Sequence, residues 1–467
     1  METLVKENKM GTMKIPKLLF TIAVPIIISM LVQALYNIVD SIFVARYDDA
    51  AGTGALTLAF PIQNLIIALS VGLSIGMNAI LSRALGEKKR DKASLAAGQG
   101  FFLTFCGYLV FLVFGLFLTR AFVNMQISDM ENVNPELLKK YSVEYISIVC
   151  IGSIGIFIQV TTERLLQSTG KSLLSMTVQL SGAITNIILD PILIFGWLGL
   201  PEMGVRGAAI ATVIGQLVSA ALGIILNLKF NTELTLRLKN MLPNPKLLAE
   251  ILAVGIPSVL MQAIGSVMTF SMNNILLGFS LHAMNVFGVY FKLQSFVFMP
   301  IFGLNNGMVP IIAYNYGARK RERVYGALRL AVICAVSYMA LGVLAFQLIP
   351  GPLLSLFNAK EEMLAIGKTA LRIISISFIL AGASISSIGA CQALGKSIYS
   401  LIVSVVRQLV VLIPSAYLLS LTGNVNAVWW AFPIAELVGC TCCMLFLMRV
   451  LKICFGKEAK QENNNVN

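Results

Sequence analysis

Apolar runs of about 20 residues or more dominate the chain, and short polar segments separate them. A run of this length crosses about 30 Å of hydrocarbon as a helix. The pattern predicts spanning helices near 17–45, 55–82, 93–118, 141–163, 173–198, 207–228, 247–278, 285–315, 324–348, 363–391, 397–421 and 428–451. We therefore expect an all-α membrane protein with twelve transmembrane helices.

The second half of the chain repeats the first half with substitutions. Segment 63–92 returns as 294–323, and segment 167–172 returns as 392–397. Each half holds an even number of predicted crossings, so both halves enter the membrane from the same side and form parallel six-helix repeats. The predicted domains are an N-terminal six-helix lobe at 1–230, a cytoplasmic linker at 231–246, a C-terminal six-helix lobe at 247–455 and a disordered cytoplasmic tail at 456–467.

The charged residues assign the sides of the membrane. Only 12% of residues are charged and 57% are hydrophobic, whereas about 25% are charged in soluble domains. Lys and Arg precede the first span and gather after the even-numbered spans, and such residues in short loops are retained in the cytoplasm. We expect a multi-pass protein of a plasma (inner) membrane with both termini in the cytoplasm. The formal charge of +13 then reflects this bias and predicts no nucleic-acid partner.

The sequence offers little for catalysis. His282 is the only histidine, and the pair Cys440 and Cys443 has no second cysteine pair or histidine cluster beside it. We interpret these cysteines as packing residues and predict no enzyme activity, no resident metal and no cofactor. The chain also lacks a nucleotide-binding loop motif, so we expect no coupling to ATP.

One face of the first predicted helix is polar. Gln33, Tyr36, Asn37 and Asp40 are spaced by three, four and seven residues, which places them on one side of a helix. A carboxylate inside a spanning helix costs several kcal/mol, so this face points to protein or water and not to lipid.

Two further predicted helices carry polar pairs at the same depth. Asn186 and Asp190 are one helical turn apart, and so are Thr212 and Gln216. Counting about 1.5 Å per residue places Asp40 and Thr212 each about 9 Å inside the external surface. Carboxylate, amide and hydroxyl oxygens at one level suit a monovalent cation such as Na⁺ or a shared proton. The alternative is a network that only holds helices together, but the second half lacks such acids, which favours a coupling site.

Other charged residues in the spans have two interpretations each. Arg407 and Glu436 both fall near mid-membrane and either form a buried ion pair or line a cleft. Lys292 faces either the cleft or a helix end. Glu163 is either a cytoplasmic gate or substrate-contact acid, or an interfacial residue paired with a base.

Apolar and polar residues of the seventh and eighth predicted helices are candidates for the wall of a substrate cleft. These candidates are Met268, Met272, Phe287, Phe291 and Gln294. Prolines within spans remove a hydrogen bond and permit bending. The hinge candidates are Pro25, Pro191 and Pro257.

In order and spacing, several segments together resemble the multidrug and toxic compound extrusion (MATE) family, and within it the MepA-like and DinF-like bacterial branch. These segments are 23–25, 33–40, 72–86, 165–171, 186–191 and 204–209. The resemblance implies a V-shaped pair of six-helix bundles that extrudes cationic, amphipathic compounds in exchange for Na⁺ or H⁺. It also implies a first-lobe cation site at Asp40, Asn186, Asp190 and Thr212.

We therefore predict a monomeric secondary transporter that works by alternating access in the lipid bilayer and exports cationic drugs or dyes. The main alternative is a flippase for lipid-linked precursors from the same superfamily. A channel is disfavoured because the acids occur in one half only and no pore loop is repeated. A membrane enzyme is disfavoured because no nucleophile and base, or metal ligands, occur together.

Overall fold

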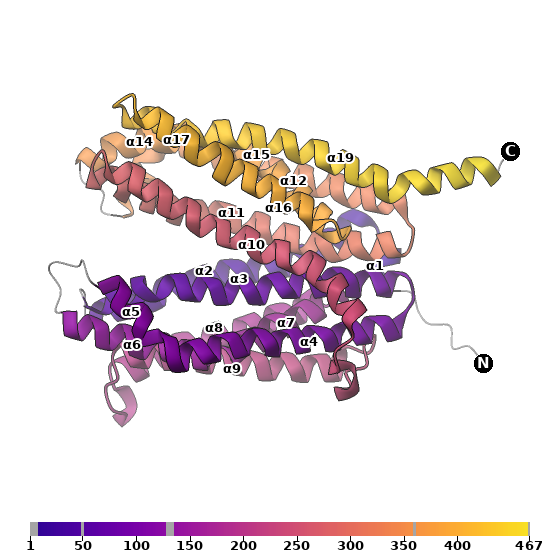
Figure 1. The fold of residues 1–467 in the computed structure, drawn as a ribbon, viewed down its shortest axis with the longest axis horizontal. Coiled ribbons are helices and arrows are strands. Elements are labelled where there is room, and N and C mark those ends of the chain that lie inside the picture. The colour runs from indigo at the N-terminus through magenta and orange to yellow at the C-terminus, as the bar shows by residue number, and fades with distance from the viewer. Residues whose placement is uncertain (1–7, 48–50, 128–134, 358–360, 466–467) are drawn as a thin grey trace. The chain divides into compact units, whose positions relative to one another are not determined.

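The computed structural model describes residues 8–47, 51–127, 135–357 and 361–465, and these residues are mostly helical (Figure 1). The helices of the first half are α1 (Lys9–Thr12), α2 (Ile15–Tyr47), α3 (Ala51–Gly86), α4 (Arg90–Val113), α5 (Thr119–Ile127), α6 (Pro135–Ile151), α7 (Ile154–Ser168), α8 (Ser172–Ile194) and α9 (Val205–Phe230). Short irregular helices add η1 (Phe114–Leu118), η2 (Trp197–Gly199) and η3 (Leu238–Met241).

The second half has the same plan. Its helices are α10 (Pro245–Leu277), α11 (Leu281–Gly317), α12 (Arg321–Leu348), α13 (Pro350–Ser355), α14 (Glu361–Ser375), α15 (Phe378–Ala393), α16 (Ser397–Val405), η4 (Val406–Leu412), α17 (Ile413–Ser420), α18 (Val425–Val428) and α19 (Ala431–Asn465). Helix α19 continues through most of segment 456–467, which the sequence predicted to be a disordered tail.

The number of membrane crossings agrees with the sequence. Among the described residues, ten helices are long and apolar enough to span a bilayer, and two bent helix pairs raise the number to twelve. The pairs α6–α7 and α14–α15 bend by 44° and 48° at equivalent places in the two halves. The first bend falls at Gly152 and Ser153, and a Gly/Ser pair is a common cause of a kink. The all-α fold with two six-helix repeats is thus confirmed.

The described helices pack into two compact units whose borders differ from the predicted lobes. Unit 1 consists of Met1–Ile27, Leu85–Lys88 and Ile256–Asn467, and unit 2 consists of Ile28–Ala84 and Lys89–Gly255. Helix α2 therefore passes from unit 1 to unit 2 just after Pro25, and α10 passes from unit 2 to unit 1 just before Pro257. Both changes occur where proline removes an intrahelical hydrogen bond.

In unit 1, the short helix α1 is held by the ends of α11 and α12. Asn315 donates from Nδ2 to the carbonyl of Met10 at 3.0 Å. Arg323 donates from Nη2 to the carbonyls of Met10 and Met13 at 2.9 and 2.7 Å. Met10 is fully buried. Helix α1 and the end of α19 lie at the same end of this unit (Figure 1).

In unit 2, the segment before α10 is held in a comparable way by α4. Gln99 is fully buried. Its Nε2 donates to the carbonyls of Asn240 and Leu242 at 2.8 and 2.7 Å, and its Oε1 accepts from the amide of Asn244 at 2.8 Å. The segments that precede α2 and α10 are thus each anchored by a buried side chain, Asn315 in unit 1 and Gln99 in unit 2.

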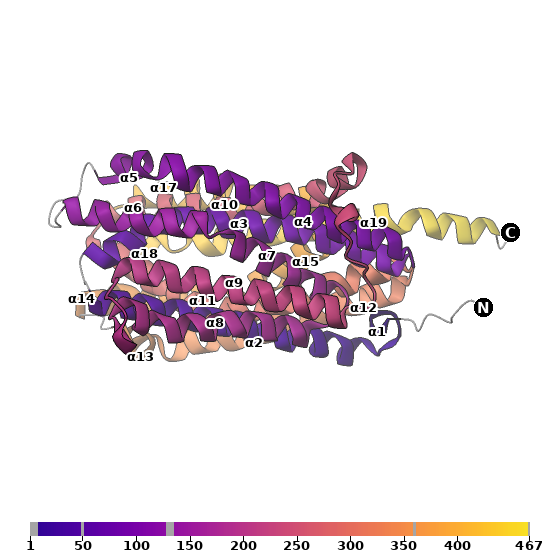
Figure 2. The ribbon, with the colours of Figure 1, turned by 90° about the horizontal axis from the view of Figure 1, so that it is seen from below.

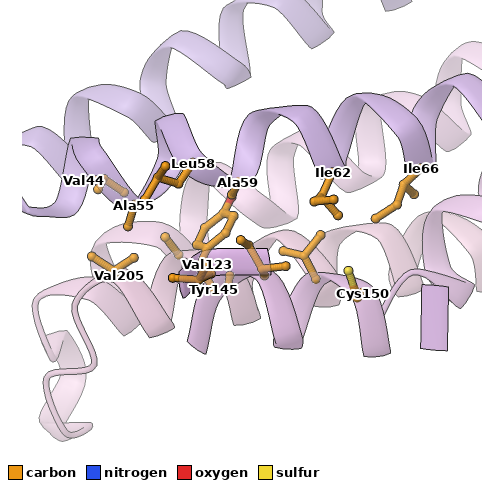
Figure 3. Packing of buried hydrophobic residues seen from close by; sticks show 14 of the residues in the cluster. Val44, Ala55, Leu58, Ala59, Ile62, Ile66, Val123, Tyr145, Cys150 and Val205 are labelled. Atoms are coloured by element: carbon orange, nitrogen blue, oxygen red, sulfur yellow. The ribbon is translucent and has the colours of Figure 1, made fainter. Parts of the chain in front are cut away.

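Unit 2 contains an apolar core. Val44, Leu58 and Ile62 from α2 and α3 pack with Tyr145 and Cys150 from α6 (Figure 3). In a membrane such a core is stabilised by van der Waals contact, because lipid tails are as apolar as the side chains. The core fixes α2 and α3 against α6, so the polar face of α2 is held in one orientation.

Helices α8 and α9 lie side by side in unit 2 with very little space between their backbones (Figure 1, Figure 2). Gly182 and Gly215 face each other there: a Cβ added to Gly182 would lie 2.2 Å from Ser219 Oγ and 3.0 Å from the Gly215 carbonyl. Small residues permit this close approach. It brings the polar positions of α8 and α9 within hydrogen-bonding distance of each other.

Candidate functional site

Three of the predicted coupling residues form a hydrogen-bonded group between α8 and α9. Asp190 is fully buried, and its Oδ1 accepts from Asn186 Nδ2 at 3.2 Å. The same Asn186 nitrogen donates to Thr212 Oγ1 at 3.4 Å. The one-turn spacing of Asn186 and Asp190 on α8 makes the first contact, and the close crossing with α9 makes the second.

Asp40 on α2 belongs to the same group electrostatically. Its carboxyl group interacts with that of Asp190. Both residues lie in unit 2, so α2 and α8 present two acids to one region. Two carboxyl groups that interact in a site of low dielectric constant favour a counter-ion beside them or a proton on one of them.

The group contains acceptor oxygens that the protein leaves unpaired. Asp40 Oδ1, Asp190 Oδ2, Asn186 Oδ1 and Gln216 Oε1 are buried, and none has a hydrogen-bond partner among the described residues. Leaving one buried acceptor unsatisfied costs about 1–3 kcal/mol. A set made of oxygens, two of them on carboxyl groups, fits a hard monovalent cation or a bound proton.

A small cavity adjoins these residues in unit 2. Its volume is about 20 Å³, and Tyr36, Asn186, Thr212 and Gln216 line part of it. Tyr36 also interacts electrostatically with Asp40 and with Asp190. The predicted supporting residues Tyr36 and Gln216 are therefore placed at the site. Gln33 is half-buried on α2, and the Asn37 side chain lies outside the described residues.

Glu163 is hydrogen-bonded to Gln159, one of the residues that line this cavity. Its Oε1 accepts from Gln159 Nε2 at 3.0 Å, and the same nitrogen donates to Gln179 Oε1 at 2.9 Å. Glu163 therefore contacts the interior of the bundle, which favours the gate or contact interpretation over an interfacial one. The sequence analysis missed Gln179, although it lies two helical turns from Asn186 on the same face of α8.

The cleft candidates of the second half divide into buried and partly exposed residues. Met272 and Phe287 are fully buried. The centroid of the Phe287 ring lies 4.8 Å from the ring centroid of Phe291, 5.8 Å from that of Phe432 and 6.4 Å from that of Trp429. Met272 and Phe287 therefore pack in the core of unit 1, and a role for them in a cleft wall stays a prediction. The candidates that are half-buried are Met268, Phe291 and Gln294.

The structure also shows where the charged residues in the spans of the second half lie. Arg407 Nη1 lies 3.2 Å from Glu436 Oε2 and 3.3 Å from Oε1, so the ion-pair interpretation is confirmed. Arg407 sits in the π-helical segment η4. Lys292 is exposed, and its Nζ lies 5.8 Å from the centroid of the Phe357 ring, a cation–π distance.

The three hinge candidates have different settings. Pro25 in α2 and Pro257 in α10 lie beside the two places where a helix changes unit. Pro191 follows Asp190 directly inside α8, which ends three residues later at Ile194. Bending at these prolines stays a prediction.

Comparisons with known proteins agree along almost the whole chain. A family model described as MatE matches residues 25–192 and 257–418. The multidrug export protein MepA of Staphylococcus haemolyticus is 26% identical over 436 residues, which cover 93% of this chain and 94% of the relative. The MepA protein of Staphylococcus saprophyticus is 26% identical over 425 residues, or 91% and 92%.

Solved structures agree with the fold. An outward-facing multidrug resistance MATE family transporter of the MOP superfamily superposes with a TM-score of 0.87. It is 24% identical, and the match covers 96% of this chain and 98% of that chain.

Proposed function

This chain belongs to the MatE family, and on that premise we propose that it exports cationic amphipathic drugs or dyes in antiport with Na⁺ or H⁺. The transport cycle is alternating access, in which the coupling ion and the cargo occupy the protein in turn. The observation that carries this proposal is that Asp40, Asn186, Asp190 and Gln216, all in unit 2, each keep a buried oxygen without a hydrogen-bond partner among the described residues. Such a group is stable only when a positive charge is present, so it can exchange one cation for another.

The proposed orientation places both termini in the cytoplasm of a bacterial cell and the coupling site nearer the outside. The turns that join α3 to α4 and α11 to α12 support it, since they carry Lys88, Lys89, Arg319 and Lys320. A membrane potential of 100 mV acts on one inward-moving charge with about 2.3 kcal/mol. This corresponds to a gradient of about fiftyfold when one ion is exchanged for one neutral cargo molecule, whereas exchange for one singly charged cation is electroneutral and is driven by the concentration gradient of the ion alone.

The preference for cationic cargo follows from the acidic residues of the protein and from its many adaptable apolar side chains. The acids of unit 2 attract positive charge, and the chain contains 20 Met and 26 Phe residues. Methionine adapts to irregular shapes, and aromatic faces attract cations. Polyspecific binding of lipophilic cations needs both properties.

The experiment is ion-driven ethidium transport in vesicles that contain the purified protein, with separate Na⁺ jumps and pH jumps. Asp40→Asn and Asp190→Asn each remove one carboxylate, so we expect both to lose ion-driven transport. Asp91→Asn is the matched control, because Asp91 is exposed and the chemical change is the same. Near-normal transport by either of the first two variants contradicts the coupling assignment.

A competition series tests the cargo class in the same vesicles. Tetraphenylphosphonium should inhibit ethidium transport more strongly than neutral or anionic compounds of similar size. Equal inhibition by all three classes, or transport of an anionic lipid-linked sugar alone, would instead support a flippase.

A further inference from the structure

A polar stripe runs along α8 from the coupling site toward the start of the helix. Gln179, Asn186 and Asp190 lie on one face, at relative positions 0, 7 and 11. The stripe is about 16 Å long at about 1.5 Å per residue. Between the polar residues lie Gly182 and Ala183, which have little or no side chain. A spanning helix that needed only to pack would not require polar residues over this length.

The space beside the stripe is the cavity of about 20 Å³. A cavity needs about 10–15 Å³ to hold one water molecule, so this one has room for a water or a small cation. Asn186 is 3% exposed and lines the cavity, yet its Oδ1 has no hydrogen-bond partner among the described residues. Gln216 Oε1 is unpaired in the same way. These two oxygens can receive a cation that leaves the carboxylates.

Two amide side chains that line the cavity are hydrogen-bonded to each other. Gln159 and Gln179 are both 8% exposed and both line the cavity. Gln159 Nε2 donates one hydrogen to Gln179 Oε1 at 2.9 Å and the other to Glu163 Oε1 at 3.0 Å. When the first bond opens, the second still holds Gln159, so the amide pair can separate without leaving Gln159 unpaired.

Beyond the amide pair, Glu163 extends the polar series toward the end of unit 2 that we propose to be cytoplasmic. It lies five residues before the end of α7 at Ser168, or about 8 Å along the helix axis. Polar side chains thus follow one another from Asp190 through Asn186, Gln179 and Gln159 to Glu163, with only the small residues Gly182 and Ala183 between them on α8.

We propose that this cavity is the inner section of a pathway by which the coupling ion leaves the Asp40–Asp190 site, and that the Gln159–Gln179 hydrogen bond is its gate. The pathway lies within unit 2 and rests on the proposed function. The ion passes from the carboxylates to the free oxygens of Asn186 and Gln216. It then passes between the separated amides to the cytoplasmic side.

The test uses Gln179→Leu, which keeps the side-chain size, removes the amide and places an apolar group in the pathway. Purified protein is measured in two ways: ion-dependent thermal stabilisation reports binding at the carboxylates, and vesicle transport of ethidium reports the full cycle. We expect stabilisation like that of the unsubstituted protein, with transport slowed about tenfold or more, because an ion crossing an apolar section is strongly disfavoured. Thr177→Val, an exposed polar-to-apolar change on α8, should alter neither measurement.

Two more variants keep the proposal testable if Gln179→Leu does not fold. Gln159→Leu breaks the same hydrogen bond from α7 and should give the same split between binding and transport. Gln179→Ser keeps a polar group and should restore most of the transport rate. Normal transport by both leucine variants, or loss of ion-dependent stabilisation in either folded variant, overturns the pathway. Absence of ion-driven transport in the unsubstituted protein overturns the proposed function instead.

Discussion

The ion pair between Arg407 and Glu436 gives a stability prediction whose size follows from its burial. Glu436→Gln leaves the Arg407 guanidinium in a spanning segment without its carboxylate. The two side chains are 21% and 11% exposed. Removing one partner of a buried pair costs about 3–5 kcal/mol. Because Arg407 retains some exposure, we expect the lower value of about 3 kcal/mol, which lowers the folding equilibrium constant by more than about a hundredfold.

The assay measures unfolding of the detergent-purified protein on heating or on addition of denaturant. Glu250→Gln is the matched control, since it makes the same change in the exposed pair of Lys92 and Glu250. Those side chains are 37% and 48% exposed, and such pairs contribute about 0–1 kcal/mol. The double variant Arg407→Gln with Glu436→Gln should recover most of the loss, because no charge is left unpaired.

The geometry also limits what a charge swap can restore. The Arg407 stem packs so closely on α19 that a Cβ added to Gly439 would lie 2.9 Å from Arg407 Cδ. A glutamate at position 407 is shorter and loses this contact, so exchange of the two residues should recover only part of the stability. The reasoning is refuted if Glu436→Gln melts at the temperature of the unsubstituted protein. A changed affinity for drug in that same variant would assign Glu436 to the cargo site.

Two further predictions test the packing of each unit. Gly182→Ala should destabilise the protein by about 1–3 kcal/mol, because the new Cβ would lie 2.2 Å from Ser219 Oγ. Adding Ser219→Ala to this variant should restore part of the melting temperature. An unchanged melting temperature for Gly182→Ala contradicts the close crossing of α8 and α9. Arg323→Gln removes donors to the carbonyls of Met10 and Met13, so limited proteolysis should cut near α1 faster than in the unsubstituted protein. Equal cleavage rates would show that other contacts hold α1.

The grouping of polar residues at the candidate site could largely be predicted from the sequence, because these residues follow helical spacing. Asn186 and Asp190 are one turn apart, and a carboxylate inside a span is conspicuous in an apolar chain. Gln179 follows the same spacing but is uncharged, so it gave a weaker signal. Its partner Gln159 comes from another helix, and a contact between helices has no pattern along the chain.

Other placements had no clear signal in the sequence. Met272 and Phe287 were predicted to line a cleft because they are large and apolar, but in a membrane protein lipid, core and cleft all accept such residues. The passage of α2 and α10 between units also left no trace in the sequence. Pro25 and Pro257 predicted bending there, whereas only the packing of the helices shows which unit each segment joins.

The anchoring of α1 has a consequence for the order in which the chain is made. The carbonyl of Met10 bonds to Asn315, which follows it by 305 residues. At about 5–20 residues per second, a ribosome needs about 15–60 s to synthesise that interval. The first segment therefore enters the membrane long before its partners exist. A polypeptide stopped at its midpoint would leave α1 and the start of α2 without the helices they pack against. The two halves must therefore be translated as one chain, or be made as two polypeptides that associate.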